Sequence, residues 1–457
     1  MRRPSNLTHV LAASVLALAS ARGEALAAPE TLQEVLADTY RDNPTISAQR
    51  YALRGTDEQV PQALSGWRPS VAITSQITRG RQFFNFAPPP VEDLTNRVYA
   101  MTITQPIYHA GTQPDIDRAE ATVAGGQLQL SSVEQQQLLT AAIAYLDVFR
   151  DQGTVELNRN LVQVLGVNRQ NVDATYRAGT ATETDTSQAA ARRSGAVSGE
   201  LGAESQLATS LARFRDVVGH DAGTLAPPAV IGEVPPTEDE AVSLALGHNP
   251  ALLAARKQLE AARHQVDVER GQLLPKFDGI GEIEHEDELF AKSVRLNSAT
   301  IGIEATVPIY EAGSVYSKVR AAREAVSQAE KQIEQAERDT RQQVSTAWNA
   351  LAAARAQQQN FRDQIRANEV ALRDTQLEVD AGTRTRLDTL NAEQELFTSR
   401  VNLVFAEHDT VVASFQLEAG VGGFTPDALG LDVPRYDPAK HLNAVRDKWM
   451  GTQPPAD

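Results

Sequence analysis

Acidic side chains at recurring positions are the first candidates for chemistry in this sequence. One aspartate follows an Ala-Gly-Thr sequence in each half of the chain, Asp185 in the first half and Asp388 in the second. Other carboxylates alternate with different residues in segments of β character and therefore share one face of each segment. Repeated carboxylates of this kind can attract cations or line a water-filled passage. The members of the alternating set are Glu282, Glu284, Glu286 and Glu304.

The usual catalytic arrangements are absent from the sequence. The eight histidines are scattered, and there is no His-Glu-x-x-His, no Gly-x-Ser-x-Gly and no phosphate-binding loop after a strand. Isolated histidines on helical stretches, such as His248 and His264, are expected to be surface groups. We therefore do not expect an enzyme, and the sequence predicts neither a cofactor nor a metal site.

The first residues indicate export from the cytoplasm. Two arginines precede an apolar run over residues 10–19, and Ala25-Leu26-Ala27 has the small-x-small form that signal peptidase cleaves. Residues 1–27 are therefore expected to be a signal peptide, since the run is too short for a membrane span. An anchored N-terminal helix is the alternative. Cleavage after Ala27 would remove three arginines and one glutamate and take the net charge from −16 to −18. An acidic chain is not expected to bind nucleic acid. The chain contains no cysteine, so neither a disulfide nor a thiol-linked lipid is available.

The chain repeats itself once. The offset between the halves is 206 residues for the first two matching motifs, then 202 and 203. A period this long indicates a duplicated domain rather than a solenoid. The matching motifs are Asn-Pro at 43–44 and 249–250, residues 64–69 and 270–275, Pro-Ile-Tyr-x-x-Gly at 106–111 and 308–313, and Ala-Gly-Thr at 178–180 and 381–383.

The repeats divide the chain into five parts. The first structural repeat is expected over residues 28–219 and the second over 238–423, joined by a Pro- and Gly-rich linker at 220–237. Residues 424–457 are expected to form a C-terminal segment. This segment and the linker are expected to lie together about halfway along the long helices described below.

Each repeat contains one predicted β-hairpin, at residues 69–107 and 275–309. The strands are about 10 residues long, the length that a tilted strand needs to cross a bilayer. Ordinary surface hairpins on a soluble domain would show the same alternation. If the strands do lie in a membrane, four of them cannot close a barrel, because single-chain barrels begin at about eight strands. Three chains would give twelve strands, and the faces bearing Glu282, Glu284 and Glu304 would then line a water-filled lumen.

Very long helices follow the hairpins. No proline occurs between Pro114 and Pro227 or between Pro308 and Pro426. Residues 314–380 would form a helix of about 67 residues, roughly 100 Å long, with a heptad seam from Val319 to Leu372. The returning helix, 386–420, is half as long, and so are the helices expected at 31–65 and 238–273. Two such half-length helices stacked end to end would match one long helix.

The order and spacing of these motifs resemble the TolC family of outer-membrane efflux proteins. The pairs Asn-Pro, Pro-Ile-Tyr-x-x-Gly and Ala-Gly-Thr-x-Thr-x-x-Asp carry the resemblance, which extends from about Glu30 to Gly422. The resemblance implies a fold of α and membrane β structure. Each chain of a homotrimer would give four strands to a twelve-stranded outer-membrane barrel, and long coiled periplasmic helices would form an α-barrel with a mixed equatorial domain. The implied partners are a periplasmic adaptor protein, an inner-membrane transporter of the ABC or RND type and outer-membrane lipid.

The resemblance also assigns roles to residues at the helical tips, residues 178–182 and 381–385. The tips would dock the adaptor, and Asp185, Asp388 and Asn391 would lie at the periplasmic entrance. The chain departs from the family at three positions. Asn391 stands where the family has a second aspartate, Val379 where it has a tyrosine, and Glu407 where it has an arginine. In the family, this tyrosine and this arginine belong to the bonds of the closed entrance. Asp185 and Asp388 can equally be read as charges that stabilise helix N-termini. The docking residues implied are Gly179, Thr180, Gly382, Thr383 and Arg384.

The expected function is that of a channel through which an inner-membrane transporter and its adaptor export a substrate across the outer membrane, either in multidrug efflux or in type I protein secretion. The alternative is a periplasmic adaptor or structural coiled-coil protein that is not inserted in the outer membrane. The cargo is not encoded in a recognisable motif.

Overall fold

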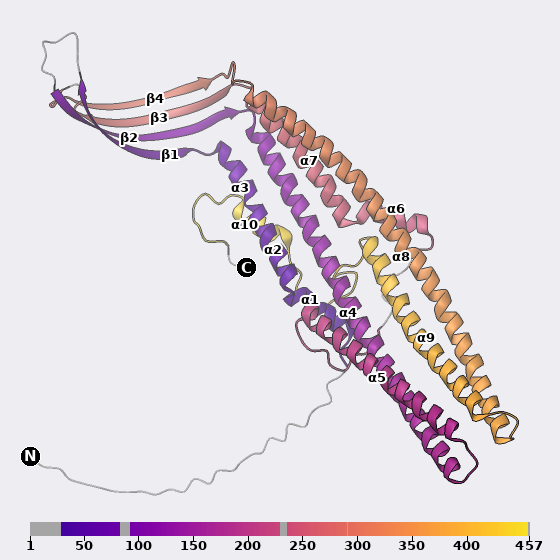
Figure 1. Ribbon diagram of the computed structural model, residues 1–457. Helices are drawn as coiled ribbons and strands as arrows, with labels where there is room; N and C mark the ends of the chain where they lie inside the picture. Colours follow the sequence, from indigo (N-terminus) through magenta and orange to yellow (C-terminus); the bar gives the residue numbers. More distant parts are fainter. Residues whose placement is uncertain (1–28, 83–91, 229–234, 290, 456–457) are drawn as a thin grey trace, which may run out of the picture.

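The chain combines a small β-sheet at one end with very long helices that run away from it (Figure 1). A computed structural model describes residues 29–82, 92–228, 235–289 and 291–455. The signal peptide expected at 1–27 lies outside these residues. None of the described helices is both long enough and apolar enough to cross a membrane.

The sheet has four antiparallel strands in the order β1-β2-β3-β4, so that β1 and β4 are its edges. Each repeat supplies one hairpin, and β2 joins the first hairpin to β3 of the second over the pairs from Arg97–Asp287 to His109–Lys276. Because side chains alternate along a strand, directly opposed residues share a face. The strands are β1 (Ser70–Gln82), β2 (Glu92–His109), β3 (Lys276–Asp287) and β4 (Arg295–Thr306).

Two helices run the whole length of the helical part. They are α4 (Thr112–Arg177) with 66 residues and α8 (Ser314–Asp380) with 67 residues, each about 100 Å long. Each turns at its far end into a returning helix of about half that length, α5 (Glu183–Val218) after α4 and α9 (Arg386–Gly420) after α8. The expected bounds of α8 and α9 are confirmed. Every position of the expected heptad seam of α8 is buried or half-buried, which confirms the coiled packing.

The helices that enter the hairpins are interrupted, and the expectation of one continuous helix at 31–65 is wrong. Asn43 ends α1 (Leu32–Asp42) and also caps the N-terminus of α2 (Pro44–Asp57), because its Oδ1 accepts hydrogen bonds from the next helix and Pro44 occupies the first helical position. The second repeat is broken in the same way at Asn249, between α6 (Glu238–His248) and α7 (Pro250–Gly271). The remaining helices are α3 (Gln59–Leu64), the 3₁₀ turn η1 (Ser65–Trp67) and α10 (Pro438–Val445).

The same asparagines join the half-length helices end to end. Nδ2 of Asn43 donates to the carbonyl of Val217 at the end of α5 over 3.0 Å. Nδ2 of Asn249 donates to the carbonyl of Gly420 at the end of α9 over 3.1 Å. In each case the N-terminus of a helix on the side of the sheet (α2 or α7) meets the C-terminus of a helix on the side of the tips (α5 or α9), so the dipoles of the two helices align. We call these two contacts the Asn43 and Asn249 junctions.

The main apolar core lies at mid-height, where α1, α4, α5 and α9 meet. Tyr145, Phe214 and Phe415 are fully buried there. The C-terminal segment joins this core through Phe424 and Leu431 and then continues along α2 towards the sheet (Figure 1). Its far end reaches η1, where Arg68 donates to the carbonyls of Arg446 and Lys448. The tail therefore extends beyond the mid-height belt in which it was expected.

Candidate functional site

The two helical tips end in the same turn. Gly179 has φ of +80° and Gly382 has φ of +76°, a left-handed conformation that favours glycine. In each turn the following threonine N–H bonds back to the helix, Thr180 to the Thr175 carbonyl over 3.0 Å and Thr383 to the Glu378 carbonyl over 2.9 Å. These bonds satisfy carbonyl groups that a helix end leaves unpaired.

The aspartate behind each tip is held by the first turn of the returning helix. Oδ2 of Asp185 accepts the backbone N–H of Thr182 over 2.8 Å, and Oδ2 of Asp388 accepts that of Thr385 over 3.0 Å. The threonine hydroxyls donate to the same oxygens. The backbone and hydroxyl donors of Thr182 lower the pKa of Asp185, and the hydroxyl and backbone donors of Thr385 lower that of Asp388. Asp185 is exposed and Asp388 is half-buried, so both carboxylates cap a helix while remaining in contact with solvent.

The tips of the two repeats are bridged on one side. Arg192 of α5 donates to Oδ1 of Asn391 of α9 over 3.0 Å. A groove of about 430 Å³ lies between the tips and is lined by residues that include Thr180, Asp185, Thr385 and Leu390. Asp185 therefore faces this groove, whereas Asp388 is not among its lining residues. The structure brings the tips of both repeats to the same end of the molecule, where Asp185 of the first repeat and Leu390 of the second line one groove.

The positions that depart from the family pattern have local partners here. Glu407 accepts a hydrogen bond from Arg362 over 3.0 Å, which joins α9 to α8. Val379 is half-buried in the last turn of α8. Arg384 pairs with Glu378 at 2.6 Å within the same tip. One of these ion pairs therefore joins α8 to α9, and the other lies within a single tip.

The sheet has one polar and one apolar face. Glu282 is opposite Thr102 and Thr300, and Glu284 is opposite Ala100 and Ser298. Glu304 is opposite Asp278, which is an even number of residues from Glu282 on β3 and therefore lies on the same face. All these carboxylates thus share the polar face. The other face exposes large apolar side chains along every strand: Val71, Ile73, Ile77, Met101, Ile103, Ile283, Ile301 and Ile303.

Sequence reasoning missed a buried polar network at mid-height. Oδ1 of Asp147 in α4 lies 3.0 Å from Nε2 of His408 in α9, and Asp151 accepts from Ser210 of α5 over 2.6 Å. Arg150 pairs with both aspartates. Burial acts to raise the pKa of Asp147, but the His408 contact and the Arg150 charge outweigh it and lower the pKa. The spacing of Asp147, Arg150 and Asp151 on one helix was the only local signal, and their partners are far away in the sequence.

Comparison with known proteins decides the family. The family model described as "Outer membrane efflux protein" matches residues 12–220 and 241–423. The chain belongs to the outer membrane efflux protein family. Outer membrane efflux protein BepC of Brucella suis is 31% identical over 449 residues, covering 98% of this chain and 97% of BepC. Alkaline protease secretion protein AprF of Pseudomonas aeruginosa is 24% identical, covering 72% of this chain and 70% of AprF.

Solved structures show the same fold. The outer membrane protein VceC of Vibrio cholerae superposes with a TM-score of 0.75 at 19% identity, covering 86% of this chain and 96% of VceC. The CmeC outer membrane channel of Campylobacter jejuni gives 0.76 at 14% identity, covering 91% and 89%. This outer membrane efflux protein is thus an export channel of the outer membrane whose helices extend into the periplasm.

Proposed function

We propose that three copies of this chain form one continuous export duct, which receives its substrate at the helical tips and releases it outside the cell. The observation that carries the proposal is the form of the sheet. It has an open strand at each edge, one apolar face and one polar face. Backbone groups at an open edge would be unpaired in lipid, at a cost of several kcal/mol each. Pairing β4 of one chain with β1 of the next removes every edge when the ring closes.

The faces of the sheet support the same assembly. Ile301 is 94% exposed and Ile73 is 79% exposed, although both are β-branched apolar residues. Such a face is unfavourable in water and favourable against lipid. The carboxylates of Glu282, Glu284 and Glu304 would then face a water-filled lumen. A periplasmic adaptor or structural coiled-coil protein would gain nothing from this division of the sheet.

The partners follow from the position of the tips. Gly179, Thr180, Gly382, Thr383 and Arg384 are farthest from the sheet and would dock a periplasmic adaptor, which in turn connects an inner-membrane transporter of the ABC or RND type (Figure 1). The names of the relatives include both efflux and protease secretion. The duct therefore serves as a passive exit whose cargo is set by the transporter.

The assembly can be tested by disulfide crosslinking, because the chain has no cysteine of its own. We pair Ala72→Cys on β1 with a cysteine scanned over positions 298, 300 and 302 of β4. At least one pair is expected to give covalently linked trimers on a non-reducing gel. The matched control joins Thr102→Cys to Glu282→Cys, which are opposed within one chain and should give only a crosslinked monomer. If no edge pair yields a species larger than a monomer, the proposed closure is wrong.

The orientation is tested by surface labelling. Ser293 lies in the turn between β3 and β4, at the end of the sheet away from the helices. We expect Ser293→Cys to react with an impermeant maleimide on intact cells. Glu183→Cys, exposed in the first turn of α5, should react only after the outer membrane is permeabilised. The reverse pattern would invert the topology.

A further inference from the structure

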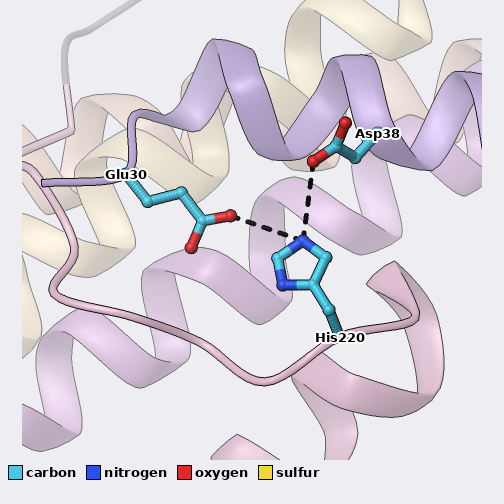
Figure 2. A group of neighbouring side chains, drawn as sticks. All are labelled: Glu30, Asp38 and His220. Atoms are coloured by element: carbon cyan, nitrogen blue, oxygen red, sulfur yellow. Dashed lines mark ion pairs between the residues drawn. The ribbon is translucent and has the colours of Figure 1, made fainter. Parts of the chain in front are cut away.

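A cluster of three metal-ligating side chains lies at mid-height, away from the tips and the sheet. Glu30 precedes α1, Asp38 lies on α1, and His220 follows α5 at the start of the linker (Figure 2). One ligand atom from each residue lies within 4.8 Å of the others. His220 is 190 positions from Glu30 and 182 from Asp38 in the sequence, so no spacing motif indicates the cluster.

The separations match the geometry of a small coordination sphere. Nε2 of His220 lies 3.4 Å from Oε1 of Glu30 and 3.6 Å from Oδ2 of Asp38. Zinc binds nitrogen and carboxylate oxygen at about 2.0–2.2 Å, and tetrahedral geometry then places ligand atoms about 3.3–3.6 Å apart. Both measured separations fall at this spacing and exceed the usual length of a charge-assisted hydrogen bond.

One ring nitrogen of His220 makes no hydrogen bond. Nδ1 lies 3.0 Å from the backbone carbonyl of Asp221. A carbonyl can only accept, so Nδ1 carries the proton. Nε2 is buried and makes no hydrogen bond in the structure, although it points between two carboxylates (Figure 2). In the neutral ring, the lone pair of Nε2 faces the negative carboxylates of Glu30 and Asp38, an arrangement that needs a cation. A backbone carbonyl on the opposite nitrogen is also the usual orienting contact of a metal-bound histidine.

The fold holds each ligand in place independently. Gly219 ends α5 with φ of +100° and thereby directs His220 back towards α1. The ring of Phe214 lies edge-on against the imidazole at 5.8 Å. Glu30 is fixed by its backbone, which donates to the Thr224 carbonyl over 2.8 Å and accepts from Ala226 over 2.9 Å.

The charges around the cluster are also arranged for a cation. The second oxygen of Asp38 pairs with Arg41 at 2.5 Å, which orients the carboxylate and leaves Oδ2 for the metal. Asp221, whose carbonyl orients the histidine, has its own carboxylate paired with Arg215.

We propose that Glu30, Asp38 and His220 bind one divalent transition-metal ion of the zinc class, with water completing the coordination. The imidazole favours zinc, nickel, copper or iron over calcium and magnesium, which prefer all-oxygen sites. The bound ion ties the start of the linker to the N-terminal segment of the first repeat, at the level of the Asn43 junction. This role is separate from the export path.

The test uses the full chain in detergent, purified with a tag that contains no histidine and stripped with a chelator. Titration with Co²⁺ and Zn²⁺ in competition with a chromophoric chelator should show one tight equivalent, with the visible absorption of four-coordinate Co²⁺. His220→Gln should weaken that equivalent at least about 100-fold, since loss of an orienting group alone costs about 10–100-fold. Glu30→Gln and Asp38→Asn should each weaken it as well.

His248→Gln is the matched control, because His248 is exposed on α6 and its Nδ1 also lies 3.0 Å from a backbone carbonyl. This variant should bind metal as the parent does. Zinc-edge absorption of the loaded parent should report a single imidazole among oxygen ligands, a measurement that does not depend on the folding of any variant. If the parent binds metal no more tightly than His220→Gln, or if the edge spectrum lacks imidazole, the cluster is an ion pair of protonated His220 and the proposal is overturned.

Discussion

Gly382→Val is expected to abolish export while the protein still assembles and enters the outer membrane. Gly382 has φ of +76°, and a β-branched side chain there costs about 1–2 kcal/mol or more. A Cβ at this position would meet no heavy atom within 4 Å apart from its neighbours in the chain, so the strain expected there is that of the backbone conformation. The tip must therefore change its turn, and the docking surface proposed for Thr383 and Arg384 would be lost. Export of a reporter substrate, with trimer content in membranes measured alongside, checks this.

A second substitution distinguishes the effect of straining the left-handed turn from the effect of adding a side chain. Asparagine tolerates the left-handed region, so Gly382→Asn should retain most of the export. Gly179 has the same conformation at the other tip, and Gly179→Val measures whether both tips contribute to docking. Normal export by Gly382→Val would place the partner surface elsewhere.

Asp388→Asn is expected to relieve block of the channel by polyvalent cations in planar bilayers, and far more than Glu284→Gln does. Three copies of Asp388 would converge at the narrow end of the trimer, where their charges add. Glu284 would lie in the wider part of the channel, where salt screens it better. Asparagine is chosen because its side-chain oxygen can still accept the bonds from Thr385 that the carboxylate accepts. Single-channel conductance should change as well, because the constriction dominates the resistance.

The pH dependence of the block has a defined direction. Within one chain, the hydroxyl and backbone donors of Thr385 lower the pKa of Asp388, which acts to keep the carboxylate charged as the pH falls through the ordinary aspartate range. The block should persist there and weaken only at lower pH. Thr385→Val removes the hydroxyl donor and leaves the charge, so it should retain the block at neutral pH. If Asp388→Asn behaves as the parent, Asp388 serves only as a helix-capping charge.

Local patterns in the sequence predicted much of this fold. The bounds of α8 and α9 follow from proline-free runs that end at glycine, and the seam of α8 follows from its 3-4 spacing. The division of the sheet into two faces follows from alternation along the strands. The break at Asn43 was also encoded locally, because Asn-Pro is a helix-start signal, and we overlooked it inside an otherwise helical pattern.

The rest could not be predicted because it depends on contacts between distant segments. Nothing near Asn43 indicates that its amide reaches Val217, and nothing near His220 indicates Glu30. The path of the C-terminal segment depends on distant contacts, among them the hydrogen bonds from Arg68 to carbonyls more than 370 residues away. The pairing of Asn391 with Arg192 likewise crosses between repeats.

The Asn249 junction has a mechanical consequence. A continuous helix resists bending along its whole length, whereas here the lower helix α9 meets the upper helix α7 through a side-chain hydrogen bond rather than through backbone in register. α9 has 35 residues and is about 50 Å long. Used as a lever, it converts a pivot of about 5° at the junction into a sweep of about 4 Å at its free end. In the proposed trimer, such a pivot would change the aperture at the tips, and α8, which passes the junction without a break and packs along α9, would limit how far the pivot can go.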